Sequence, residues 1–302
     1  MVRLAWPLWL VSSVAFALPP SGKAPGQEIE LWVRPSGNAP RQKVTIDLAA
    51  KPKLEVTRED LQYDGAKAKY RGVPLRALIE TMDHPGRSDL ALLHYNNGMI
   101  VPLPLDDLEV LKTLDPFVAT EMQVNDLWIS TFPMVTKKGA DERDARPLKF
   151  RFNKVVVGPK THPFTTKQAQ ADGFSPFFYG DSLVGIELVR AENWYKQFDV
   201  GTTEQAKRGF EVFKSHCQFC HSTREVGGRY GIDFLVPNPI VDRLNLHKLF
   251  LHVRYRDRNA AETGQMMPFF KDVSKEDAIA LHEWLKAVTA ARPMPYVAPP
   301  HH

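Results

Sequence analysis

The stretch Cys217-Gln218-Phe219-Cys220-His221 places two thiols and an imidazole within one short segment. Two residues between the cysteines allow both thiols to bond to one edge of the same porphyrin, and the histidine that follows can reach the iron. Cys-x-x-Cys-His therefore predicts one haem c, attached covalently through Cys217 and Cys220, with His221 as the proximal iron ligand.

Cysteines at this spacing also occur in periplasmic disulfides, in thioredoxin-like dithiols and in zinc sites. Cys217 and Cys220 are the only cysteines of the chain, which excludes a zinc site with four thiolates. A zinc finger with two cysteines needs two histidines at short spacing further along the chain, and this is not the arrangement around His247 and His252. The disulfide and the dithiol remain open as alternatives.

Residues 1–17 have the organisation of a secretory signal peptide. Met1-Val2-Arg3 is a short basic start, Leu4 to Leu18 is apolar, and Ala15-Phe16-Ala17 is a small-x-small cleavage signal. This apolar run is shorter than the roughly 20 residues that cross a bilayer as a helix. We expect export to the periplasm, where haem attachment of this kind occurs, and no stable membrane span after cleavage. A retained amino-terminal anchor is the alternative.

Composition and charge favour a globular protein. The hydrophobic fraction is 43%, which provides core for one large domain or two ordinary ones. Residues 202–302 carry 14 Lys plus Arg against 11 Asp plus Glu, and two haem propionates would offset most of this excess. The charge pattern therefore predicts no nucleic-acid partner, whereas a local basic rim would steer acidic redox proteins of the periplasm.

Helical patterns occupy the last third of the chain. Thr203 is expected to cap a helix that leads into the motif. Val241 to Arg256 is expected to form a second helix, and residues 275–290 a third, which Ser274 caps. The proline-containing segment Val236 to Ile240 lies between the motif and the second helix. We expect it to offer a backbone carbonyl to the second ring nitrogen of His221, because such bonds orient a ligating imidazole.

Residues 203–290 resemble the class I cytochrome c domain, which carries a single haem. In that family a helix ends at Cys-x-x-Cys-His and crosses the last helix, and a methionine from an extended loop is the second axial ligand of the iron. Gln265-Met266-Met267-Pro268-Phe269 is similar to that loop. The resemblance implies Met267 as the distal ligand, with Met266 as second choice and His252 as a further alternative.

Residues 27–200 have a pattern of short strands with sparse helices, so the predicted class is α+β, with a strand-rich part followed by an all-α part. Asn96-Asn97-Gly98 predicts a hairpin turn, because asparagine and glycine tolerate positive φ. Thr136 to Arg146 is expected to be a charged loop, and residues 293–302 a flexible tail. The strands are expected at Ile29–Val33, Lys43–Leu48, Lys53–Val56, Ala91–Tyr95, Ile100–Leu103, Pro147–Val157 and Leu183–Val189.

Two stretches of this strand-rich part resemble the molybdopterin-binding fold of the sulfite-oxidase type. They are Gly72-Val73-Pro74-Leu75 and the strand, turn and strand from Leu92 to Leu103. Members of that family bind molybdenum through a cysteine thiolate before the Gly-Val-Pro-Leu element, and this chain has no cysteine there. We therefore expect a relative without a molybdenum cofactor that serves as a docking or scaffold module.

The function expected from these features is transfer of single electrons between redox partners, since both axial positions of the iron would be filled. A haem-containing oxidoreductase, or its cytochrome subunit, acting on a small substrate such as an inorganic sulfur compound is the alternative; a haem sensor or assembly factor is a third class. No catalytic residue is predicted. Asp106 and Asp107 are interpreted as solvated charges at a helix start, and His94 as a partly buried histidine with a satisfied ring.

Overall fold

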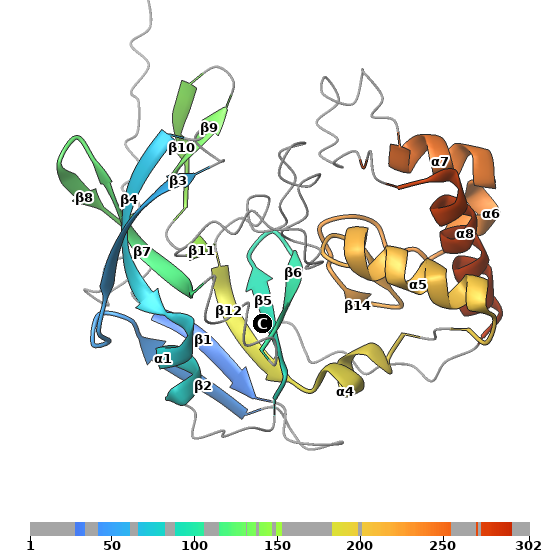
Figure 1. The fold of residues 1–302 in the computed structure, drawn as a ribbon, viewed down its shortest axis with the longest axis horizontal. Helices are drawn as coiled ribbons and strands as arrows, with labels where there is room; N and C mark the ends of the chain where they lie inside the picture. The colour runs from blue at the N-terminus through green and yellow to red at the C-terminus, as the bar shows by residue number, and fades with distance from the viewer. Residues whose placement is uncertain are drawn as a thin grey trace, which may run out of the picture.

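The computed structural model describes residues 28–33, 42–60, 66–81, 88–105, 115–130, 132–136, 139–146, 149–152, 183–198, 201–254, 270 and 273–291. These residues form an α+β protein, as the sequence predicts (Figure 1). The predicted signal peptide, Asp106, Asp107 and the predicted tail lie outside the described residues. None of the described helices is long and apolar enough to cross a membrane.

The first sheet has five strands in the order β2-β1-β12-β5-β6. Strands β1 and β12 run parallel, and every other neighbouring pair is antiparallel. Strand β6 is therefore at an edge of the sheet. The bounds are Glu28–Val33 for β1, Gln42–Asp47 for β2, Leu90–Tyr95 for β5, Ile100–Pro104 for β6 and Leu183–Val189 for β12.

The second sheet has the order β11-β7-β4-β3, and β8 pairs with β7. It contains a separate buried cluster centred on Tyr70 and Phe117. The short helix α1 (Leu75–Glu80) follows β4 directly, with Pro74 as its N-cap residue. The bounds are Leu54–Asp60 for β3, Ala66–Pro74 for β4, Pro116–Val124 for β7, Leu127–Ile129 for β8 and Lys149–Phe152 for β11.

The prediction of a charged loop from Thr136 to Arg146 is wrong. Its residues end strand β9 (Phe132–Thr136) and form strand β10 (Gly139–Arg146), and the two strands pair as an antiparallel ribbon. Pairing of the backbone with a neighbouring strand overrides the loop signal of the charged side chains, because strand formation depends more on context than on intrinsic propensity.

The predicted starts of two helices are confirmed. Helix α5 (Glu204–His216) begins after Thr203, whose hydroxyl oxygen accepts a hydrogen bond from the backbone N–H of Ala206 at 3.1 Å. Helix α8 (Lys275–Ala290) begins with a capping box between Ser274 and Asp277. These side chains satisfy N–H groups that have no partner inside the helix.

The single helix expected from Val241 to Arg256 is divided into α6 (Ile240–Arg243) and α7 (Leu246–Arg254). Leu244 is extended between them. The side chain of Asn245 accepts a hydrogen bond from the backbone N–H of Lys248 at 2.9 Å. Asparagine competes well for an N-cap position, so a new helix begins here.

Helices α5 and α8 pack against each other at close range. A Cβ atom at Gly209 would lie 2.0 Å from the carbonyl oxygen of Ala280, so only glycine fits at this position of α5. The ring of Trp284 lies 4.6 Å from that of Phe213 and 5.6 Å from that of Phe210, between ring centroids. The crossing therefore combines a backbone contact with aromatic packing.

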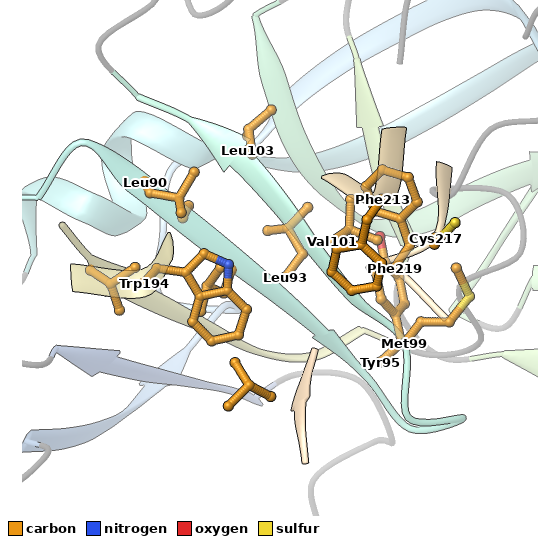
Figure 2. Close-up of a cluster of buried hydrophobic side chains, with 14 of the residues drawn as sticks. Leu90, Leu93, Tyr95, Met99, Val101, Leu103, Trp194, Phe213, Cys217 and Phe219 are labelled. Atoms are coloured by element: carbon orange, nitrogen blue, oxygen red, sulfur yellow. The ribbon is translucent and has the colours of Figure 1, made fainter. Parts of the chain in front are cut away.

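The buried side chains of the first sheet continue without a break into those of the helices. Helix α4 (Ala191–Tyr195) follows β12 and contributes Trp194 to this cluster. Figure 2 shows Leu93, Met99 and Val101 from the β5–β6 hairpin in the same cluster as Phe213 and Phe219. The hairpin therefore lies where the sheet meets the helical part of the chain.

Candidate functional site

The Cys-x-x-Cys-His motif begins where helix α5 ends. The backbone N–H of Cys217 donates to the carbonyl of Phe213 at 2.8 Å, which closes the last helical turn. The N–H groups of Cys220 and His221 then both donate to the carbonyl of Cys217, at 3.1 and 2.9 Å. The two cysteines and His221 therefore lie on one tight backbone turn that follows α5.

Both cysteines are free thiols in a largely apolar environment. Cys217 is 4% exposed and Cys220 is partly exposed. Burial raises the pKa of each thiol to about 12, with a smaller contribution to Cys217 from its neighbour Cys220. A reactive dithiol of the thioredoxin kind needs a lowered pKa and an accessible thiolate, so these surroundings disfavour that alternative.

The ring of His221 is oriented by a backbone carbonyl. Its Nδ1 atom lies 2.8 Å from the carbonyl oxygen of Ile232. A carbonyl oxygen can only accept, so Nδ1 carries the proton and the lone pair of the neutral ring is at Nε2. The sequence predicts a bond of this kind from Val236 to Ile240; the structure places the acceptor four residues before that segment, so the predicted position is wrong.

Two neighbours of the His221 ring set its plane. The ring of Phe234 stacks on it, with 4.5 Å between centroids and an interplanar angle of 27°. On Gly231, a Cβ atom would lie 2.4 Å from Cε1 and 2.7 Å from Nδ1 of the imidazole. Any side chain at position 231 would therefore displace the ring from its place.

Asp233 holds the loop that carries Ile232. Burial by itself raises the pKa of this carboxyl, but the hydrogen bonds that it accepts outweigh burial and bring the pKa below its ordinary value. The carboxylate therefore stays charged and accepts hydrogen bonds from the chain before and after the loop. The donors, at 2.7 to 3.2 Å, are the hydroxyl of Ser222 and the backbone N–H groups of Arg224, Glu225, Leu235 and Val236.

We expect Asp233→Ala to lower the free energy of unfolding at pH 7 by about 3 kcal/mol, because the donors that face the carboxylate lose a charged acceptor. The pKa of Asp233 is lowered by folding, so its contribution is present above its unfolded pKa of about 4 and is lost as the pH falls below that value. Urea unfolding at pH 7 and pH 3 measures both effects. Asp242→Ala, at an exposed position of α6, is the matched control, and an equal loss in both variants would contradict this role of Asp233.

The residues expected on the distal side of the site, Met267 and Met266, both lie outside the described residues. His252 lies within α7, and His247 of the same helix is exposed. Among the residues that the structure describes, no group of three or more histidine, cysteine, aspartate or glutamate side chains could hold a metal ion.

His94 has the environment that its sequence context predicts. Its Nε2 atom lies 3.2 Å from a carboxylate oxygen of Glu187, and the two side chains are 20% and 5% exposed. The ring also meets the edge of Trp32, with 5.1 Å between centroids. The prediction of a partly buried histidine with a satisfied ring is confirmed.

Sequence reasoning missed three features of the site: the contact of Gly231 with the imidazole, the loop centred on Asp233, and the contact of the β5–β6 hairpin with the motif. Gly227-Gly228-Arg229-Tyr230-Gly231 was the available signal for the first of these, since repeated glycine indicates close approach of backbone to another group. The other two depend on contacts that no local pattern reveals.

No protein-family model matches this chain, and comparison with curated proteins finds no match. The interpretation of the site therefore depends on the side chains that could attach a haem or bind its iron. Two thiols on one turn and an imidazole whose lone pair is at Nε2 fit the attachment and proximal ligation of a haem. The close approach of Gly231 to the ring fits a histidine whose orientation must be fixed.

Proposed function

We propose that this chain is a periplasmic c-type cytochrome with one haem, which carries single electrons between redox partners. Cys217 and Cys220 hold the haem covalently, and His221 binds its iron. The observation that carries the proposal is the 2.8 Å contact of His221 Nδ1 with the carbonyl of Ile232. Ligating histidines commonly donate their other ring N–H to such a carbonyl, which fixes the tautomer and raises the basicity of the ligand.

The arrangement of α5 and α8 supports assignment of residues 203–290 to the class I cytochrome c fold. In that family the helix that ends at the motif crosses the last helix of the domain. Here α5 ends at the motif and contacts α8 through Gly209 and Ala280. On this proposal Met267 is the distal ligand, with Met266 as second choice.

We propose that the strand-rich part, residues 27–200, is a docking or scaffold module related to the sulfite-oxidase fold. The chain has no cysteine before Gly72-Val73-Pro74-Leu75 to hold molybdenum. One haem is therefore the only redox cofactor in this proposal. The partners are periplasmic redox proteins that donate and accept the electron.

A bound haem supplies an iron centre that cycles between two oxidation states. The protein's part is to fix the ligands and to exclude water from them. Gly231 and Phe234 set the plane of the imidazole, and Ile232 sets its tautomer. The buried thiol of Cys217 and the neighbouring Phe219, which is 1% exposed, keep the attachment side apolar. An apolar environment favours the less charged, reduced state of the centre.

Met267→Ala is expected to remove the distal ligand. The ferric wild-type protein should show the weak charge-transfer band of methionine-ligated haem at the red edge of its spectrum, and this variant should lose it. The reduced wild type should remain six-coordinate and should not bind carbon monoxide, whereas the reduced variant should bind it readily. Optical spectra of both oxidation states, with and without carbon monoxide, measure these changes.

Met266→Ala is the matched control, because it removes a thioether one residue away. If Met266→Ala loses the band and Met267→Ala keeps it, the assigned register is wrong by one residue. Ready binding of carbon monoxide to the reduced wild type would contradict electron carriage and would favour the oxidoreductase or sensor alternative.

A further inference from the structure

Residues 219–229 contact the start of β6, which is one of the two edge strands of the first sheet. The backbone N–H of Ile100 donates to the carbonyl of Phe219 at 3.1 Å. Next to it, the backbone N–H of Arg229 donates to the carbonyl of Gly98 at 2.7 Å. An uncovered edge strand presents unpaired backbone groups, and here Phe219 and Arg229 supply partners for the N–H of Ile100 and the carbonyl of Gly98.

The turn of the hairpin fits closely against this segment. Gly98 has φ +86°, a left-handed conformation that glycine adopts without strain. A Cβ atom there would lie 3.1 Å from the backbone carbonyl carbon of Arg229. The two backbones therefore approach as closely as two strands do, although more than 100 residues of sequence separate them.

Side chains of the hairpin and of the motif belong to one buried cluster. Met99 and Val101 are fully buried and belong to the same cluster as Cys217 and Phe219 (Figure 2). Cys217 is 4% exposed, and the buried cluster that contains it includes side chains of the strand-rich part of the chain. Removal of the hairpin would take apolar side chains out of the buried cluster that contains Cys217.

We infer that the β5–β6 hairpin is part of the candidate site, where it holds the segment from Phe219 to Arg229 in place and shields Cys217 from water. The hairpin positions the motif and is not itself a ligand. One consequence of this inference rests on the proposed function. By excluding water, the hairpin raises the reduction potential of the bound haem. A more solvated centre favours the oxidised state, so loosening the hairpin lowers the potential.

The test loosens the hairpin in the full-length protein with Gly98→Val. The control is Asn125→Val, which strains the β7–β8 turn at φ +48° in the other sheet. Amide hydrogen exchange at Arg229 and Ile100 should become about tenfold faster, or more, in Gly98→Val, because these amides lose their partners. Both amides should keep wild-type exchange in Asn125→Val, and the potential should fall in Gly98→Val alone.

A second pair of variants covers the case in which Gly98→Val does not fold. Met99→Ser removes an apolar contact from the hairpin without straining its backbone, and Met122→Ser does the same in the separate cluster of the second sheet. Unchanged exchange at Arg229 in folded Met99→Ser would overturn the inference, and so would an unchanged potential in the haem-bearing variant. Faster exchange in a chain that never carries haem would support the positioning role of the hairpin and overturn only the proposed function.

Discussion

Replacing both Cys217 and Cys220 with alanine is expected to abolish covalent haem completely. They are the only cysteines of the chain, so no other thiol can replace them. Haem bound only through His221 would be removed by denaturation, because the iron bond does not survive loss of the fold. Haem staining of a denaturing gel measures the effect, with equal protein in each lane checked by an independent stain.

The single variants Cys217→Ala and Cys220→Ala should each retain at most one attachment, and the amount of stained protein should fall in both. Ser215→Ala, two residues before the motif, is the control for a small change at the end of α5 and should stain as strongly as the wild type. Staining of the double variant at wild-type intensity would contradict attachment through these thiols.

Gly209→Leu is expected to lower the free energy of unfolding of the helical part by about 3 kcal/mol or more. The new Cβ would lie 2.0 Å from the carbonyl oxygen of Ala280 and 2.8 Å from the Cβ of Trp284, so α5 and α8 would have to separate. Separation would also loosen the aromatic contacts of Phe210 and Phe213 with Trp284. Urea unfolding followed by circular dichroism measures the loss.

Lys207→Leu is the matched control, because it places the same side chain at an exposed position of α5. Its free energy of unfolding should stay within about 0.5 kcal/mol of the wild-type value. A loss of stability in the control as large as that in Gly209→Leu would show that the close crossing of the helices is not the cause.

Local signals in the sequence predicted much of the fold. The caps at Thr203 and Ser274 and the turn at Gly98 each depend on a few neighbouring residues, and the structure confirms all three. Strand β4 was missed although its sequence alternates: Ala68 and Tyr70 are buried, whereas Lys67 is exposed. Alternation of this kind is the sequence signal of a half-buried strand.

Pairings between distant segments were not predictable in the same way. Strand β10 forms because β9 is beside it, and its charged sequence carries no sign of that neighbour. The break before α7 depends on the cap formed by Asn245, a short signal inside a strongly periodic stretch. Tertiary contacts decide such cases more than propensity does.

The candidate site likewise combines features that local sequence predicts with features that depend on contacts between distant segments. The spacing of Cys217, Cys220 and His221 is local, so the sequence alone predicts their role. The sequence predicts that a backbone carbonyl accepts from the imidazole, but it does not predict that this carbonyl belongs to Ile232. The position of Ile232 depends on the loop that Asp233 holds. The contact of Gly98 with Arg229 joins segments that are distant in sequence, and no pattern in either segment indicates the other.

The most direct test of the central claim is the covalent haem and metal content of the full-length protein purified from its own periplasm. We predict that the intact mass of the denatured chain will exceed that of the polypeptide by one haem, and that elemental analysis will find about one iron and essentially no molybdenum per chain. A denatured chain with the mass of the bare polypeptide would contradict the proposal that this is a c-type cytochrome. Stoichiometric molybdenum would contradict the scaffold role proposed for the strand-rich part and would indicate an oxidoreductase.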